Sequence, residues 1–236
     1  MIGWSGYNIP EEVIYALGII PIRIGAGGDD RLVELGSRYI STKNCVFVRE
    51  TVGLFAENKD PYIQNIDLVA FDATCLQAFR TAEVLEFFFK KKVIILGVPR
   101  NFHWDEAKTY FTKEVEYFTK RLEDFAGIKL DDEKLIEAIN LYNKTRNTIK
   151  EIYNYQAEKN SLISWEDSYE VIQAGYYLDR KEFLNLLEDL LTEIKGIQPN
   201  TIIDVDFNED EARIFISGSV IPPGDKKLIN GICHLK

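Results

Sequence analysis

The chain has 236 residues and carries 28 Lys and Arg against 38 Asp and Glu, a net charge of −10 at pH 7. Apolar residues make up 46%, enough for a buried core, so composition excludes a mainly disordered chain. The acidic balance argues against general nucleic-acid binding, because such proteins need excess positive charge to displace counterions from phosphates.

No apolar run approaches the roughly 20 residues that a bilayer-spanning helix needs. The first residues lack the basic segment and apolar run of a signal peptide. Three cysteines are an odd and low number for a disulfide framework. We therefore expect a cytoplasmic protein that binds neither membrane nor nucleic acid, and whose thiols are buried fillers, a nucleophile or metal ligands.

The first residues of the chain alternate between extended and helical patterns. Residues 2–5 are short and apolar, and residues 19–24 are β-branched and extended. Between them, Pro10 opens a helical stretch that Gly18 ends. A second helix is predicted over about residues 29–40.

Two further strands and the helix between them complete this pattern. Residues 68–71 and 93–98 are continuous apolar runs, as buried parallel strands are, and residues 75–89 have apolar side chains on broadly one helical face. Strands and helices that alternate at these lengths predict an α/β fold with a parallel sheet. We assign residues 1–103 to a Rossmann-like N-terminal domain.

The middle of the chain is helical in pattern. Apolar residues from Ala107 to Phe125 recur at steps of three and four, which predicts a long amphipathic helix. Asp131 and Ser164 are suitable N-caps for two more helices. Residues 104–200 are therefore predicted to form a long helical insertion.

The last residues return to a strand-like pattern. Residues 213–219 suggest a strand followed by a small-residue turn, and residues 225–232 suggest the start of a helix. One strand and one helix cannot bury a sheet face of their own, so this pair either docks on the first domain or belongs to another. We interpret residues 201–236 as the start of an incomplete second α/β domain.

The cysteines are the side chains with the most chemical interest. Cys75 ends a predicted strand and begins a helix, where ligands of open α/β sheets bind and where the helix dipole favours a thiolate. A buried cysteine acting as a small hydrophobe is the alternative there. Cys45 precedes either a short strand or a helix, and its pattern taken alone favours a core residue. Cys233 lies among apolar residues of the predicted last helix, where a core role is favoured.

Several segments, in order along nearly the whole chain, together resemble one protein family. They include the stretch from Gly3 to Arg23 and the segments around Cys45 and Cys75. The first resembles the opening of the subunits of 2-hydroxyacyl-CoA dehydratases and benzoyl-CoA reductases, and the other two resemble the first two cysteine motifs of these subunits. Further matches are Val98-Pro99-Arg100, the helix with Asn143 and Arg146, and Ile216-Ser217-Gly218-Ser219. The chain resembles roughly the first two-thirds of such a subunit.

The resemblance implies a [4Fe-4S] or double-cubane iron–sulfur cluster held by three cysteines per subunit, with one coordination position open to substrate oxygen. By this resemblance, Cys45 and Cys75 are the first two ligands. Glu12 is a candidate for proton transfer and Ser5 for binding the substrate hydroxyl. In the family the third ligand comes from the second α/β domain, and Cys233 falls before its expected place.

The implied activity is that of a lyase subunit. An ATP-dependent activator protein supplies one electron, which reduces the thioester of an acyl-CoA to a ketyl radical that expels its hydroxyl group as water. The implied partner is a homologous subunit, in a homodimer or heterodimer. Two alternatives stay open: a related benzoyl-CoA-type or double-cubane-cluster reductase, and a non-catalytic, degenerate subunit that lacks the cluster.

Overall fold

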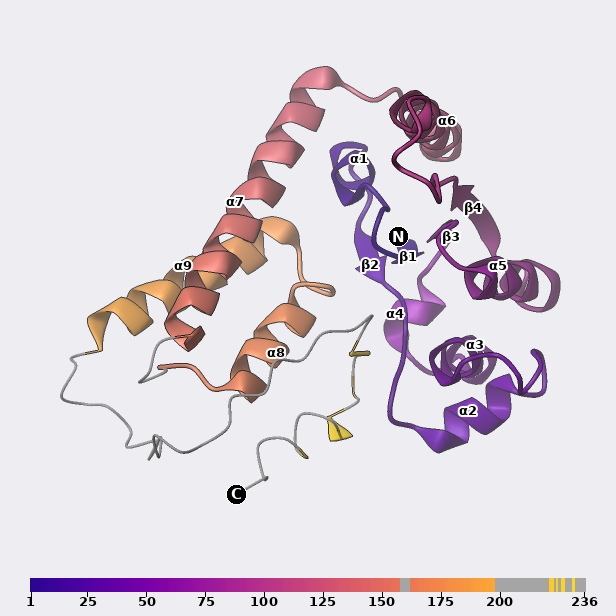
Figure 1. The fold of residues 1–236 in the computed structure, drawn as a ribbon, viewed down its shortest axis with the longest axis horizontal. Coiled ribbons are helices and arrows are strands. Elements are labelled where there is room, and N and C mark those ends of the chain that lie inside the picture. Colours follow the sequence, from indigo (N-terminus) through magenta and orange to yellow (C-terminus); the bar gives the residue numbers. More distant parts are fainter. Residues whose placement is uncertain (158–161, 198–220, 223, 225, 228–230, 232–236) are drawn as a thin grey trace. The chain divides into compact units, whose positions relative to one another are not determined.

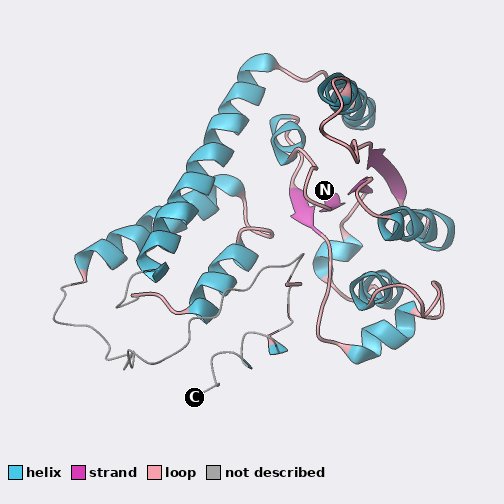
Figure 2. Cartoon of the chain, viewed as in Figure 1, coloured by secondary structure: helices cyan, strands magenta, loops and turns pink. Residues whose placement is uncertain are grey.

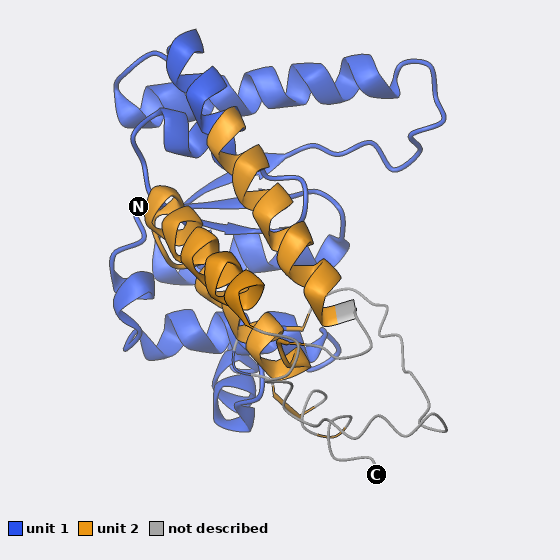
Figure 3. Cartoon of the chain, turned by 90° about the vertical axis from the view of Figure 1, so that its left-hand side faces the viewer, with its two compact units in different colours: residues 1–139, 222–225 blue, residues 140–221, 226–236 orange. Residues whose placement is uncertain are grey.

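The computed structural model describes residues 1–157 and 162–197, with 221, 222, 224, 226, 227 and 231. These residues fall into two compact units, one built around Met1–Ile139 and the other around Asn140–Ile221 (Figure 3). The strand predicted over 213–219, Cys233 and most of the predicted last helix lie outside the described residues.

The first unit contains a sheet of four parallel strands, which confirms the predicted α/β class (Figures 1 and 2). The strand order is β2-β1-β3-β4. β3 is buried at every position, as its unbroken apolar run predicts. The strands are β1 (Ile2–Ser5), β2 (Pro21–Arg23), β3 (Leu68–Asp72) and β4 (Lys92–Leu96).

Helices cover both faces of this sheet (Figure 1). On one face lie α1 and α6, and on the other lie α3 and α5, with α2 packed against α3. The sequence left the segment after Cys45 open between strand and helix, and the structure makes it a helix. The first-unit helices are α1 (Glu11–Ala16), α2 (Asp30–Gly36), α3 (Val46–Glu57), α4 (Pro61–Gln64), α5 (Leu76–Phe89) and α6 (Ala107–Ala126).

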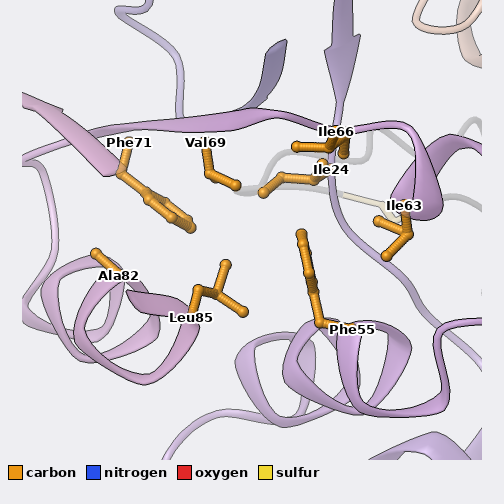
Figure 4. Close-up of a cluster of buried hydrophobic side chains, with 8 residues drawn as sticks. All are labelled: Ile24, Phe55, Ile63, Ile66, Val69, Phe71, Ala82 and Leu85. Carbon is orange, nitrogen blue, oxygen red and sulfur yellow. The ribbon is translucent and has the colours of Figure 1, made fainter. Parts of the chain in front are cut away.

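The core beneath the sheet joins β3 to α3 and α5 (Figure 4). Val69 and Phe71 point from β3 toward Ala82 and Leu85 of α5, and Phe55 of α3 fills the space beside them. Burial of this apolar surface stabilises the layer. It also holds α3 and α5 against the same face of the sheet.

Two glycines let α2 and α3 approach backbone to backbone. A Cβ atom on Gly36 would lie 1.8 Å from the carbonyl oxygen of Arg49, and one on Gly53 would lie 2.0 Å from that of Leu32. Any side chain at either position would force the helices apart. α3 is therefore locked to α2 on one side and packed against α5 on the other.

The second unit is helical. It contains most of α7 (Asp132–Ala157), together with α8 (Trp165–Ala174) and α9 (Arg180–Gly196). The predicted caps are confirmed: Asp131 accepts hydrogen bonds from two backbone N–H groups of the first turn of α7, and Ser164 accepts one from Asp167. Among the described helices, none combines the length and apolar character needed to cross a bilayer.

The second unit has its own apolar core. Ion pairs join Lys144 to Glu188 at 2.5 Å and Glu151 to Lys195 at 2.7 Å, so α7 and α9 run in the same direction. The exposed pairs add little to stability, and the packed apolar side chains carry most of it. Those buried side chains are Ile152, Ile163, Phe183, Leu187, Leu191 and Ile194.

Candidate functional site

The order of the strands indicates where a ligand would bind. From β1 the chain continues to β2 on one side, whereas from β3 it continues to β4 on the other side. The strand order therefore reverses between β1 and β3, and in open α/β sheets ligands bind outside the carboxyl ends of the strands at such a point. The loops that follow these two strands hold residues 6–10 and 73–75.

A buried carboxylate ties these two loops together. Asp72, only 1% exposed at the end of β3, accepts hydrogen bonds from the backbone N–H groups of Tyr7 (2.8 Å) and Asn8 (2.9 Å). It also accepts from the Asn8 side-chain amide at 2.8 Å and from the Thr74 hydroxyl at 2.7 Å. Four bonds satisfy the buried charge.

Sequence reasoning did not single out Asp72. Its signal is an acidic residue at the end of a continuous apolar strand, where a charge is tolerated only if donors surround it. A second signal is Gly6, whose φ of +117° is open to glycine, and where a Cβ would lie 2.3 Å from the Asp72 carboxyl group. Glycine therefore lets the loop after β1 close on Asp72.

Cys75 lies at this edge as the N-cap of α5. Its sulfur accepts a hydrogen bond from the backbone N–H of Gln77 at 3.3 Å, and its side chain is exposed and forms no disulfide. The buried-hydrophobe alternative is therefore wrong for Cys75. The exposed thiol at a helix start is accessible to a metal or an electrophile.

Cys45 is the N-cap of α3 and is also exposed, so the core interpretation is wrong for it as well. α3 leads through the short α4 into the start of β3, so α3 runs opposite to the strands and begins at their carboxyl edge. The packing of Phe47, in the first turn of α3, against Gly25 after β2 agrees with this direction. Both thiols thus lie at one edge and on one face of the sheet.

The structure places the two other candidate residues, Ser5 and Glu12, on opposite faces of the sheet. Ser5 is the last residue of β1 and pairs with Phe71 of β3. It shares the strand face of Gly3, which packs against Ile66 beneath the sheet, so Ser5 lies on the face that α3 and α5 cover. Glu12 is in the first turn of α1, which covers the opposite face (Figure 1).

A pocket of about 530 Å³ opens at the same edge, where β3 and β4 end and α6 begins. Its lining is mainly apolar and aromatic, with two polar side chains, Asn8 and Thr74, and two basic ones, Arg100 and Lys108. The remaining lining residues are Ala73, Val98, Pro99, Phe102, Ala107 and Phe111. Such a mixture is typical of ligand-binding sites.

One acidic contact holds α6 beside the pocket. The Glu114 carboxylate accepts a hydrogen bond from the backbone N–H of Gly97, at the end of β4, with a length of 3.0 Å. Burial raises the pKa of the neighbouring Tyr110, and the Glu114 charge and its hydrogen bond add to the rise. The bond between Glu114 and Gly97 fixes the first half of α6 relative to β4.

The described residues fit part of an iron–sulfur site. Two exposed cysteine thiols at one edge are the donors that such clusters prefer. No group of three His, Cys, Asp or Glu suited to a metal ion occurs within the part of the chain that the structure describes. Cys45 and Cys75 would therefore supply two ligands of such a site, which needs more.

Comparisons with known proteins identify the family of the chain. A family model described as 2-hydroxyglutaryl-CoA dehydratase, D-component, matches residues 7–235. A benzoyl-CoA reductase subunit of Thauera aromatica is 24% identical over 98% of this chain and 58% of its own length. The (R)-phenyllactyl-CoA dehydratase beta subunit of Clostridium sporogenes is 24% identical over 84% of this chain and 52% of its own length.

A third relative is the beta subunit of the (R)-2-hydroxyglutaryl-CoA dehydratase of Acidaminococcus fermentans, 25% identical over 82% of this chain and 50% of its own length. This chain thus spans about half to three-fifths of the length of these relatives. The family match covers nearly the whole chain, and it confirms the resemblance seen in the sequence. The chain therefore belongs to the 2-hydroxyglutaryl-CoA dehydratase, D-component, family.

Proposed function

We propose that this chain is part of an iron–sulfur subunit of a 2-hydroxyacyl-CoA dehydratase-like enzyme. The observation that carries the proposal is the placement of Cys45 and Cys75. The two thiols are exposed and form no disulfide, and each begins a helix at the carboxyl edge of the sheet, on the same face. Thiolates held in this way are suited to iron.

The chain's own residues would have distinct tasks. Cys45 and Cys75 would hold the iron, and the Ser5 hydroxyl would bind the substrate hydroxyl group on the same face. Glu12 would hold or move a proton, provided that the substrate extends around the edge to α1. When bound, a [4Fe-4S] or double-cubane cluster would supply one electron to the thioester, and that electron would return because loss of water is redox-neutral overall.

The partners that we propose follow from this chemistry. A homologous subunit would complete the enzyme as a homodimer or heterodimer, and an ATP-dependent activator would deliver the electron. The substrate would be an acyl-CoA, and the compartment would be the cytoplasm. The relatives' names support the acyl-CoA class, because each names a CoA thioester.

Iron binding tests the proposal directly. After anaerobic reconstitution with iron and sulfide, the chain should be brown and contain both elements. Cys45→Ser and Cys75→Ser should each remove most of the iron, because each change takes away one thiolate ligand. Cys233→Ser is the matched control and should leave the iron content unchanged. A chain that stays colourless, or one that keeps its iron with both thiols replaced, would contradict the proposal.

The same measurement separates the alternatives. The benzoyl-CoA reductase relative from Thauera aromatica is similar over 98% of this chain, which supports a reductase as the second candidate. A double-cubane cluster would give about twice the iron and sulfide of a single [4Fe-4S] cluster. A well-folded, metal-free chain with both thiols titratable would instead support a non-catalytic subunit.

A further inference from the structure

The outer edge of β4 is open. β4 is the last strand in the sheet order, and no strand of the described chain pairs with its outer side (Figure 1). Leu96 accepts a hydrogen bond from the N–H of Ala73, directly after β3, so its backbone groups face inward. Backbone groups alternate in direction along a strand, so those of Val93, Ile95 and Gly97 face the open edge. An open edge of this kind can pair with a further strand.

Two side chains of α6 cover the ends of this edge. The Arg121 guanidinium donates to the carbonyl oxygen of Val93 at 3.0 Å, and the Glu114 carboxylate accepts from the N–H of Gly97 at 3.0 Å. Ile95 lies between them, and among the described residues no group bonds to its edge-facing N–H and C=O. The edge is therefore covered only by two charged side chains, which another strand could displace.

The side of α6 next to this edge has the composition of a protein interface. Glu114 and Arg121 are seven residues apart, so they lie on one side of the helix, two turns from each other. Tyr117 lies between them and is 58% exposed, and the Arg121 guanidinium is 5.9 Å from the centre of its ring. Tyrosine and arginine are enriched in protein–protein interfaces.

We infer that the edge of β4 pairs with the same edge of a second copy of this chain, antiparallel, about a two-fold axis at Ile95. The inference deepens the proposed function and rests on it for the expectation that a related subunit binds this chain. In such a pair the N–H and C=O of Ile95 bond to Ile95 of the other copy. Those of Val93 bond to Gly97 of the other copy, so the pairing satisfies all three edge residues.

Charge complementarity indicates that the occupant is a second copy. α6 runs opposite to β4, because Glu114 bonds at the end of the strand and Arg121 near its start. The two-fold axis brings the end of one strand beside the start of the other, so Arg121 of each copy faces Glu114 of the other. Both side chains leave the strand edge when the strands pair, and they form two ion pairs across the axis.

The two copies of α6 have room beside each other. The start of α6 lines the pocket together with residues that follow both β3 and β4, so the helix lies over this strand pair rather than beyond the edge. Strands lie about 4.8 Å apart, so a helix centred between β3 and β4 lies about 10 Å from its copy, the ordinary distance between packed helices. Tyr117 lies close to the axis, where the two copies of its ring contact each other.

Sedimentation of the 236-residue chain, with a reducing agent and without iron, tests the inference. The unsubstituted chain should approach twice its mass of 27.2 kDa as its concentration rises. Arg121→Glu and Glu114→Arg should each weaken association about tenfold or more, because each places two pairs of like charges across the axis. An equimolar mixture of the two variants should restore association, since both pairs in the mixed dimer are again of opposite charge.

Glu116→Arg is the matched control. It reverses the same charge on the same helix, about 200° around the helix axis from Glu114, and should associate like the unsubstituted chain. Circular dichroism shows whether each variant folds. Folded variants that do not associate on mixing would overturn the inference, and so would an unsubstituted chain that stays monomeric at every concentration reached.

Hydrogen exchange locates the surface without any substitution. The amide of Ile95 should exchange more slowly as the unsubstituted chain associates, because it gains an acceptor. The amide of Ile94, which faces β3, should change less. Association that leaves the Ile95 amide unprotected would place the interface elsewhere and overturn the inference.

The two proposals fail separately in these experiments. A chain that associates through β4 but binds no iron would retain this interface and lose the iron–sulfur function. A chain that binds iron but stays monomeric would keep the function and lose the interface.

Discussion

The helix that starts at Cys75 and the helix that starts at Cys45 begin at the same edge but are positioned by different forces. Cys75 follows directly from β3, and hydrogen bonds to Asp72 fix the turn in front of it. Cys45 follows an exposed turn, and the close backbone contact of α2 with α3 positions its helix. One thiol is therefore placed by polar bonds and the other by packing, so each can be perturbed alone.

The largest effect should come from breaking the packing behind Cys45. Gly36→Ala would place a Cβ 1.8 Å from a backbone oxygen of α3, so the helices must separate. We expect the free energy of unfolding to fall by about 3 kcal/mol, measured by urea denaturation. Relative to the unsubstituted chain, the rate at which a thiol reagent labels Cys45 should change more than the rate at which it labels Cys75.

Gly196→Ala is the matched control for this change. No atom lies within 4 Å of a Cβ at that position in α9, so its effect should stay below about 1 kcal/mol and could be stabilising. Equal losses for Gly36→Ala and Gly196→Ala would show that the contact between α2 and α3 does not position Cys45.

The next largest effect should come from Asp72→Asn, which weakens the hydrogen bonds that hold the turn before Cys75. Asparagine can keep its oxygen toward the three N–H donors of Tyr7 and Asn8, but its amide nitrogen then faces the Thr74 hydroxyl, which can no longer donate to it. All of the remaining bonds also lose the negative charge that strengthens them. We expect a loss of about 2–3 kcal/mol in the free energy of unfolding. The rate at which a thiol reagent labels Cys75 should increase more than the rate at which it labels Cys45.

Asp67→Asn is the control for that substitution. Asp67 accepts from the N-terminal amino group at 2.8 Å, but its side chain is 64% exposed, so less than about 1 kcal/mol should be lost. If Asp72→Asn were as mild as Asp67→Asn, the hydrogen bonds of Asp72 would not hold the turn before Cys75.

The smallest effect concerns the caps themselves. Cys75 accepts a bond from the N–H of Gln77, whereas Cys45 makes no such cap bond. Cys75→Ala should therefore cost a few tenths of a kcal/mol, Cys75→Ser should be neutral or stabilising because serine is a better cap, and Cys45→Ala should change nothing measurable. Thermal unfolding of the three variants checks this order, and a larger loss for Cys45→Ala would reverse it.

The sequence predicted well what depends on local pattern. Apolar runs identified β3 and β4, and the caps at Asp131 and Ser164 located the starts of α7 and α8. Pattern alone could not decide between strand and helix for the segment after Cys45, because apolar residues such as Val46 and Val48 suit both. The close contact between α2 and α3, which Gly36 and Gly53 allow, favours the helix.

The site was harder to predict for the same reason. Cys75 stood out because it lies between a strand and a helix in sequence. Asp72 and the pocket with Lys108 depend on contacts between residues far apart in the chain, such as the 64 positions between Asn8 and Asp72. Such contacts follow from the way the sheet is assembled, which short-range patterns do not encode.

The bonds to Asp72 have a consequence for ligand entry. The N–H groups of Tyr7 and Asn8 lie outside regular secondary structure, yet both donate to a buried carboxylate and should exchange with deuterium as slowly as those of the neighbouring strands. This wall of the pocket is therefore stiff. Adjustment to an incoming molecule would fall instead on residues 101–106, all of them exposed, in the second part of the connection from β4 to α6.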